Sequence, residues 1–437
     1  MSDSAQRAAG AGRTRDERRL LASTLVGTTI EWYDFFIYAQ AASLVFAPHF
    51  FGPVSQEAPG VASLLSLATI GISFLFRPLG AVVAGRFGDR LGRKAMLVMT
   101  LIMMGSATAL IGLLPTYAQI GVAAPVLLIV LRVVQGFSAG GEWGGAALMA
   151  VEHAPEGKRG YFGSYPQTGV PLGLILATGV LWLISSTTSE EQFLAWGWRI
   201  PFLLSVVLIV FGYLVRRLVE ESPVFQEMLE RKAHSSAPLR ELFRSNSRNV
   251  VLAALIFVAN NAAGYLVIAY FLSYGKSLGL SRTTVLLATI VGAVGWLVFT
   301  VHSGALSDRI GRVRTFQIGY GAVFVWMLPM FMLMETGSAV LFALAIVVLS
   351  FGIGLSYGPM SAMYAEMFPA KVRYSGVSIG YAFGAILGGA FAPTIAEALT
   401  QATGSAYAVG AYIMVLSVIS IIAVTMVREP QGADLTA

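Results

Sequence analysis

The sequence predicts an all-α membrane protein with twelve transmembrane helices in two pseudo-symmetric six-helix bundles, and three observations lead to that fold. Of the 437 residues, 56% are apolar and only 12% are charged, whereas soluble proteins have about 25% charged residues. Twelve apolar runs are each long enough to cross a hydrocarbon core of about 30 Å as a helix. A polar nonamer, G-x-x-[GS]-D-R-[LI]-G-R, occurs at Gly85–Arg93 and again at Gly304–Arg312, about half a chain length later.

The order of polar and apolar segments divides the chain into two halves. Residues 1–20 form a polar tail, 21–216 an N-terminal six-helix bundle, 217–248 a polar linker, 249–428 a C-terminal six-helix bundle and 429–437 a second tail. The alternating pattern of a membrane-spanning β-barrel is absent from the sequence. The predicted spans are, in order, residues 21–47, 62–85, 95–114, 121–150, 161–185, 198–216, 250–274, 284–306, 315–334, 338–365, 374–398 and 406–427.

Basic residues indicate which loops face the cytoplasm. Most of the 29 Lys and Arg lie in the two tails, the linker or every second inter-helix loop, which is the pattern of cytoplasmic segments in membrane proteins. The net charge of +6 is therefore explained by topology, with the lipid bilayer as a partner and no nucleic acid. The chain has no Cys and four scattered His, so no metal or other cofactor is expected. No nucleotide-binding or catalytic motif appears, which argues against an enzyme.

A second repeat supports the division into halves. Glu152 is followed seven positions later by Arg159, and Glu366 is followed by Arg373 at the same spacing. Each copy comes after a glycine-rich helix. Internal repeats related by an axis along the membrane normal are typical of transporters, in which the substrate site lies between the halves near the middle of the membrane. The sequence therefore predicts a transporter that binds a small molecule.

The nonamer resembles the signature loop of the major facilitator superfamily. Four other stretches resemble its metabolite:proton symporter family, which includes shikimate, α-ketoglutarate and proline/betaine permeases. They are Glu31–Phe35 (EWYDF), Phe76–Gly80 (FRPLG), Gly140–Gly145 (GGEWGG) and Trp196–Phe202 (WGWRIPF). The resemblance covers essentially the whole chain and implies the major facilitator fold with protons as the coupling ion. We expect a monomer in the bacterial inner membrane, with both termini in the cytoplasm.

Two acidic residues lie inside the first predicted span. Glu31 and Asp34 are three residues apart, so they are expected on one face of the helix. Ionisable residues are rare within membrane spans and usually carry function. Because burial favours the neutral form of a carboxyl group, either residue could exchange a proton near neutral pH, and the resemblance to proton symporters supports that role. The alternative is a neutralised packing pair or a partner for a buried arginine.

Two arginines are predicted inside spans. Arg132 shares a stripe of the fourth span with Gln135, and Arg77 lies in the second span beside a proline. A buried guanidinium needs a partner or a wet cavity, and its planar fork suits a carboxylate. Both arginines are therefore candidates for binding a substrate anion. For Arg132, the alternative is a permanent structural bridge to one of the two carboxylates of the first span.

Polar and aromatic residues, several of them in spans that contain proline or glycine, are further candidates for the substrate site, because amides and tyrosines can orient a polar ligand. Each of them has the alternative role of a helix–helix hydrogen bond. Taken together, they place the site between the two halves. These residues are Tyr33, Gln167, Asn260, Asn261, Tyr265, Trp296, Tyr357 and Tyr381.

The repeated nonamer is predicted to control a gate at the cytoplasmic mouth. Gly85 would allow close helix contact, Asp89 could sit at the positive N-terminus of a neighbouring helix, and Arg93 could pair with an acid. The resemblance implies that the loop latches the inner gate in the outward-facing state. A compatible alternative is that Asp89 caps the third helix and the arginines only anchor the topology. The other residues assigned to the gate are Arg90, Glu142, Glu152, Arg159, Asp308, Arg309, Arg312, Glu366 and Arg373.

These features predict a proton-coupled symporter that imports a small, carboxylate-bearing organic metabolite by alternating access. Asp34, Glu31 or both would take the proton, and the substrate carboxylate would pair with Arg132 and Arg77. Two alternatives keep the fold: a symporter of a zwitterionic osmolyte and a proton-driven exporter. A third alternative is a transporter-like sensor that moves no solute.

Overall fold

The computed structural model describes residues 25–91, 93–140, 142–152, 154–217, 238–370 and 372–435. Within these ranges every regular element is helical. Ten helical segments there have the length and apolar composition needed to cross a membrane. The helix of residues 25–44 and the shorter apolar stretch Val98–Leu113 complete the twelve predicted spans. The prediction of an all-α bundle is therefore confirmed.

The first half of the chain begins with the helix of residues 25–44, which we call the first helix. Short helices connect the long ones at one end of this half. The elements that follow are α2 (Phe46–Phe50), α3 (Gly52–Glu57), α4 (Pro59–Leu91), α5 (Arg93–Leu113), α6 (Tyr117–Ile120), α7 (Ala123–Ser138), α8 (Glu142–Glu152), α9 (Arg159–Thr187), α10 (Glu190–Ala195), η1 (Gly197–Arg199) and α11 (Ile200–Arg217).

The second half begins with a short helix that precedes the first long one. Its elements are α13 (Pro238–Ser245), α14 (Ser247–Tyr265), η2 (Leu266–Tyr270), α15 (Phe271–Ser277), α16 (Arg282–Ile310), α17 (Arg312–Met334), α18 (Ala339–Tyr357), α19 (Met360–Met367), α20 (Arg373–Ala385), η3 (Ile386–Ala390), α21 (Ala392–Thr403) and α22 (Tyr407–Thr425). Two of these, η2 and η3, are single π-helical turns inside longer helices, a feature that often marks functional sites.

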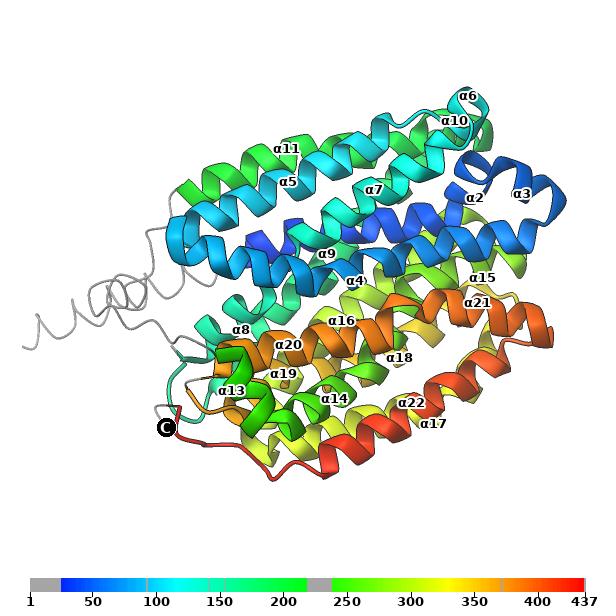
Figure 1. Cartoon of the computed structure of the whole chain (residues 1–437). Helices are drawn as coiled ribbons and strands as arrows, with labels where there is room; N and C mark the ends of the chain where they lie inside the picture. The colour runs from blue at the N-terminus through cyan, green and yellow to red at the C-terminus, as the bar shows by residue number, and fades with distance from the viewer. Residues whose placement is uncertain are drawn as a thin grey trace, which may run out of the picture.

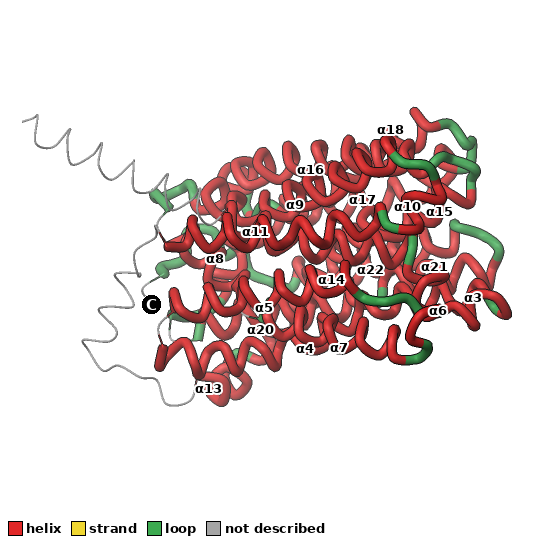
Figure 2. The backbone as a smooth tube through the Cα atoms, turned by 90° about the horizontal axis from the view of Figure 1, so that it is seen from above, coloured by secondary structure: helices red, strands yellow, loops and turns green. Residues whose placement is uncertain are grey.

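The long helices run roughly along one axis, and the helices of the two halves form separate groups (Figure 1). The view from above shows the same alignment (Figure 2), with α9 of the first half beside α16 of the second. We call the end of the bundle where α13 and the C-terminal residues lie the linker end. The opposite end, where α6 and α10 lie, is called the hairpin end.

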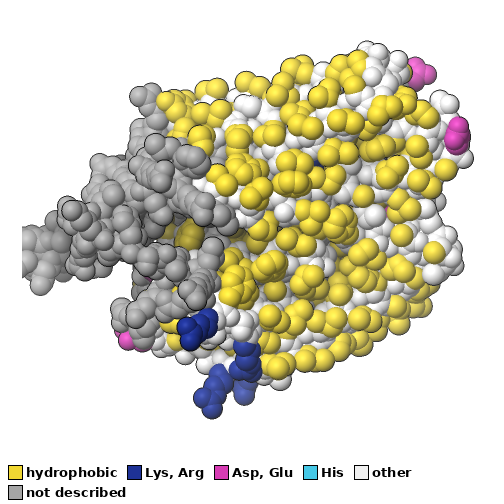
Figure 3. Space-filling view, in the orientation of Figure 1, with side chains coloured by type: hydrophobic (Ala, Val, Ile, Leu, Met, Phe, Trp, Pro, Cys, Tyr) yellow, Lys and Arg dark blue, Asp and Glu magenta, His cyan; other side chains and the backbone are white. Residues whose placement is uncertain are grey.

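The flanks of the bundle are apolar. Hydrophobic side chains cover much of the face seen in Figure 3, and the basic side chains visible there lie at the linker end. Large aliphatic residues such as Val325, Met332 and Leu387 are more than half exposed in the isolated chain. Because water would make such a surface costly, it is a surface for lipid. The molecule is a multi-pass membrane protein.

Two spans are interrupted in equivalent places of the two halves. The fourth span stops at Ser138 and resumes as α8, and the tenth stops at Tyr357 and resumes as α19. The interruption of the tenth span falls at Gly358 and Pro359, a residue pair typical of turns. By contrast, the fifth span passes through Pro166 and Pro171 as one helix, α9, because a span held between neighbours tolerates the hydrogen bonds that proline removes.

The repeated nonamer does not form a loop, which corrects the sequence prediction. In the second copy, α16 continues through Asp308 to Ile310 and α17 begins at Arg312. The only residue between them is Gly311, whose φ of 98° is a backbone conformation that favours glycine. In the first copy α4 also continues to Leu91. Apolar runs mark where a helix enters lipid, whereas a polar helix end can extend beyond the membrane.

Candidate functional site

A pocket lies between the two halves, where the first helix, α4 and the α7–α8 interruption face α20. It encloses about 40 Å³, which is room for only a few water molecules. A small organic molecule would therefore need one of its walls to move. The lining residues are Thr28, Glu31, Trp32, Arg77, Ala139, Gly140, Trp143, Gly144, Ser378, Tyr381 and Ala382.

Arg77 is the cation of this pocket. Its side chain is buried, with 7% of the residue exposed, and the guanidinium carbon lies 4.2 Å from the ring centre of Phe35 and 4.4 Å from that of Phe74. Within the part of the chain that the structure describes, Nε and Nη2 have no hydrogen-bond partner. A buried donor without an acceptor is costly, and more so when it is charged. Arg77 is therefore placed to accept an anionic ligand.

Arg132 is fully buried, and its guanidinium carbon lies 4.9 Å from the ring centre of Phe35. Its Nη1 donates to Gln135 Oε1 at 3.0 Å and its Nη2 to the Ile70 carbonyl at 3.3 Å. Its guanidinium also stacks on the Tyr38 ring at 3.9 Å. These three contacts of Arg132 are with an amide, a backbone carbonyl and an aromatic ring, and the predicted alternative of a bridge to the first helix stays a prediction. Arg132 is not in the pocket wall.

The two carboxylates of the first helix face different surroundings, which corrects the prediction that they share one face. Glu31 lines the pocket. Asp34 is buried toward α5 and α11, where its Oδ1 accepts a 2.6 Å hydrogen bond from Ser205 Oγ, and its other oxygen lies near Gly105. Residues three apart on a helix differ in direction by about 60°, enough to point at different neighbours in a crowded bundle.

The other predicted substrate residues fall into two groups. Tyr381 lines the pocket. Phe257 stacks on both Tyr381 and Tyr357, and Trp296 contacts Tyr357. Tyr265 contacts Phe74, which lies against Arg77. The remaining four make hydrogen bonds between helices, which was the alternative role. Tyr33 donates to the Pro201 carbonyl, Gln167 to that of Tyr357, Asn260 to that of Ile353 and Asn261 to that of Ala385.

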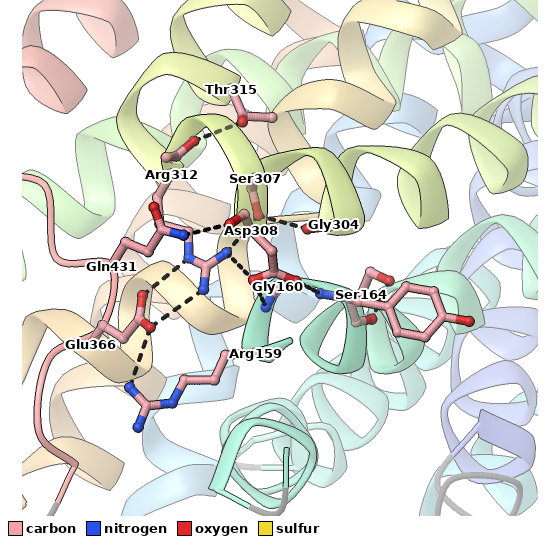
Figure 4. Close-up of polar contacts among 12 residues, drawn as sticks. Arg159, Gly160, Ser164, Gly304, Ser307, Asp308, Arg312, Thr315, Glu366 and Gln431 are labelled. Carbon is pink, nitrogen blue, oxygen red and sulfur yellow. Dashed lines mark hydrogen bonds and ion pairs between the residues drawn. The ribbon is translucent and has the colours of Figure 1, made fainter. Parts of the chain in front are cut away.

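A second cluster closes the linker end, and we call it the latch. Asp308 of the second nonamer accepts hydrogen bonds of 2.8 Å from the backbone N–H groups of Gly160 and Tyr161. These are orphan donors at the N-terminus of α9, where an anion is stabilised by the helix dipole. Asp308 belongs to the second half and α9 to the first, so this contact holds the halves together (Figure 4).

Arg312 completes the latch. It donates to Asp308 at 2.6 Å, to Glu366 at 3.1 Å and to Ser307 Oγ at 2.8 Å, and only 1% of its side chain is exposed. Figure 4 shows the guanidinium between the two carboxylates. The helices approach closely here, because a Cβ on Gly160 would lie 2.5 Å from the Gly304 carbonyl oxygen. The predicted roles for glycine, aspartate and arginine thus appear in the second nonamer.

In the Glu–Arg repeat, the arginine of each copy pairs with the glutamate of the other copy. Arg159 of the first half pairs with Glu366 of the second at 3.5 Å, and Arg373 of the second pairs with Glu152 of the first at 3.8 Å. Both ion pairs therefore join the halves at the linker end. Arg309 is exposed and makes none of these contacts. The surroundings of five other residues assigned to the gate lie outside what the structure describes. These residues are Gly85, Asp89, Arg90, Arg93 and Glu142.

The C-terminal segment takes part in the latch, which was not predicted. Glu429 accepts hydrogen bonds from the backbone N–H groups of Arg312 and Val313 at the start of α17. Gln431 donates to the Asp308 carbonyl, and the Ala433 carbonyl accepts a 2.6 Å hydrogen bond from Arg159. Glu429 lies among short polar residues after the last span, a pattern that gives no signal of docking.

Trp143 is a pocket residue that the site prediction missed. It lines the pocket and stacks on Tyr381 of the opposite half, with ring centres 3.7 Å apart. The available signal was its position between glycine pairs in an interrupted span, since a large aromatic residue there stands where backbones approach closely.

Comparisons with known proteins agree with this architecture. Residues 24–393 match the family model of the Major Facilitator Superfamily. The chain belongs to this family. It is 42% identical over 424 residues to the inner membrane metabolite transport protein YhjE of Escherichia coli (strain K12), with 95% of each chain covered. It is 39% identical over 422 residues to the shikimate transporter of the same strain, again with 95% of each chain covered.

A solved structure supports the fold independently. The crystal structure of a D-xylose–proton symporter superimposes with a TM-score of 0.76 at 18% identity, over 95% of this chain and 98% of that one. At this identity the likeness shows the fold alone. Together, the family match and the named relatives make this major facilitator protein a transporter and not an enzyme.

Proposed function

We propose that this transporter is a proton-coupled symporter of a small, carboxylate-bearing organic metabolite. One observation carries the proposal: a buried arginine, Arg77, lines the pocket between the halves with two of its nitrogen atoms unpartnered among the described residues. A ligand carboxylate would supply hydrogen-bond acceptors for these two nitrogen atoms and pair with the positive charge. The aromatic rings around it exclude water, which strengthens the pairing.

The proton site follows from the same pocket. Glu31 is the carboxylate that lines it, whereas Asp34 is enclosed by α5 and α11. A proton carrier must be reached in turn from both sides of the membrane, and a residue in the pocket wall meets that condition. We therefore assign the coupling proton to Glu31 first. Asp34, one turn away and buried, stays a second candidate.

The latch supports alternating access. In this structure it joins the halves at the linker end through Asp308, Arg312 and Glu366. The basic loops support a cytoplasmic position for the linker end, in which case the pocket would release substrate to the cell when the latch opens. The inner membrane of a bacterium is the location that this orientation and the relatives support.

Replacing Arg77 by Gln tests the substrate class. In proteoliposomes with a panel of metabolites, we expect Arg77→Gln to weaken binding of the preferred carboxylate by about 10- to 100-fold, the usual worth of a charge-assisted hydrogen bond. The methyl ester of that substrate should bind the native protein as weakly. Arg314→Gln, at an exposed position of α17, is the matched control. Native affinity in Arg77→Gln would contradict the proposal.

Replacing Glu31 by Gln tests the coupling. This variant should lose accumulation driven by an imposed pH gradient, because Gln cannot take the proton. It should keep exchange of labelled for unlabelled substrate, which needs no net proton movement. Accumulation at the native rate in Glu31→Gln would remove Glu31 from the mechanism and leave Asp34 as the remaining carboxylate to test.

One observation favours a second substrate class. The pocket carries a carboxylate, Glu31, and aromatic faces from Trp32, Trp143 and Tyr381 as well as Arg77. Aromatic faces bind cationic groups, so a zwitterion would also find complementary groups here. A panel that contains both zwitterions and simple carboxylates separates the two classes. If a zwitterion binds more tightly than the analogue that lacks its positive charge, the substrate is of the zwitterionic class.

A further inference from the structure

Trp143 closes the pocket on its α20 side. It is the second residue of α8, directly after the interruption that separates α8 from α7. Its indole lies 3.7 Å from the Tyr381 ring with an angle of 11° between the planes. Tyr381 in turn stacks on Phe257 at 4.6 Å. The indole of the first half therefore caps a row of rings that belongs to the second half.

The indole is held in place by an amide that also bridges the halves. Trp143 Nε1 donates to Gln167 Oε1 at 2.8 Å, and Gln167 Nε2 donates to the Tyr357 carbonyl at 3.3 Å. Gln167 is fully buried. If the indole moves away, the amide oxygen loses its donor in a dry environment, which is unfavourable unless a ligand or water replaces it. The orientation of Trp143 is thus sensitive to what occupies the pocket.

Between the stack and the linker end, the polar contacts that join described residues of α8 and α20 are weak, although the helices pack closely. Gly144 lies directly against Ser378, whose hydroxyl has no hydrogen-bond partner within the described ranges. Farther along, the Glu152–Arg373 pair is 3.8 Å long and its Glu152 side chain is 44% exposed. Exposed ion pairs stabilise little. The α8–α20 face therefore depends on the aromatic stack more than the α9–α16 face does, where the latch is buried.

We propose that Trp143 and Tyr381 form the inner gate of the pocket, which parts along the α8–α20 face to let substrate pass toward the linker end. Trp143 acts as a positioning residue: through Gln167 it links occupancy of the pocket to separation of the halves. This role rests on the proposed function only in that a solute passes the gate. It does not depend on the substrate class or on proton coupling.

The absence of Cys from the sequence allows a direct test. Ala382 lies in the pocket wall on α20, so Ala382→Cys provides a single thiol. A membrane-impermeant maleimide, applied to vesicles from the linker side without substrate, labels this thiol only when the gate opens. Adding Trp143→Ala should raise the labelling rate about 10-fold, because both the stack and the hydrogen bond are lost.

Further variants separate a gate from general loosening. Tyr381→Ala should match Trp143→Ala, and Trp143→Phe, which keeps a ring but loses the N–H donor, should raise the rate about 3-fold. Trp182→Ala on α9, a partly buried tryptophan outside the pocket, is the control and should leave the rate unchanged. Equal labelling in Trp143→Ala and in the single-thiol parent would overturn the proposal, as would an equal increase in Trp182→Ala. Because no substrate is present, neither result depends on the Arg77 and Glu31 experiments.

Discussion

Arg312 and Arg77 are both buried arginines, and their surroundings are opposite. Arg312 at the linker end has two carboxylates and a hydroxyl as partners. Arg77 in the pocket has aromatic faces around it and two nitrogen atoms without a partner among the described residues. In the proposed function, Arg312 with its complete hydrogen bonds holds the halves together, and Arg77 with its incomplete ones binds a ligand in the pocket.

The largest expected effect comes from breaking the complete set. Arg312→Ala removes the buried cation that Asp308 and Glu366 share and leaves Glu366 only its longer pair with Arg159 at 3.5 Å; breaking a buried pair costs about 3–5 kcal/mol. We expect a marked fall in thermal stability and in uptake, while equilibrium binding of substrate to the purified protein is kept. Arg77→Gln should show the reverse pattern. Arg314→Ala, exposed two residues farther along α17, controls for loss of charge. Equal loss of substrate binding in the Arg312 and Arg77 variants would contradict the proposed difference between the two arginines.

A smaller effect is expected from Asp308→Asn. The amide keeps one oxygen as an acceptor but offers an NH₂ group to the second backbone donor, so either Gly160 or Tyr161 loses its partner. Loss of a hydrogen bond to a charged group is worth about 1.5–3 kcal/mol. The variant should open more readily at the linker end, detected as faster labelling of the Ala382→Cys thiol. An unchanged labelling rate would show that Arg312 alone secures the latch.

The smallest effect is expected at the hairpin end. There Arg282 of the second half pairs with Glu190 and donates to Ser185 Oγ of the first half, each at 2.6 Å. The Glu190 side chain is 57% exposed, and exposed pairs contribute about 0–1 kcal/mol. Arg282→Gln should therefore change thermal stability and uptake little. If it lowers both as much as Arg312→Ala, the two ends are closed with similar strength and the comparison fails.

Much of the fold could be predicted from the sequence. Apolar length determines the spans, and the spacing of glutamate and arginine after each glycine-rich helix identifies the halves. The roles predicted for Gly85, Asp89 and Arg93 of the first nonamer stay predictions, but the equivalent residues of the second nonamer make contacts of those kinds: Gly304 lies in a close contact, Asp308 meets a helix N-terminus and Arg312 pairs with acids. Such roles can be inferred from sequence because the required backbone shape and charge are local properties of a short motif.

The partners of those residues were decided by the tertiary structure alone. Helical periodicity states which residues share a face, but it does not state which neighbouring helix covers that face. For this reason Asp34 meets Ser205 instead of the pocket, and Arg159 pairs with Glu366 of the other half instead of the nearby Glu152. The stack of Trp143 on Tyr381 likewise requires two segments far apart in the chain, and only packing brings them together.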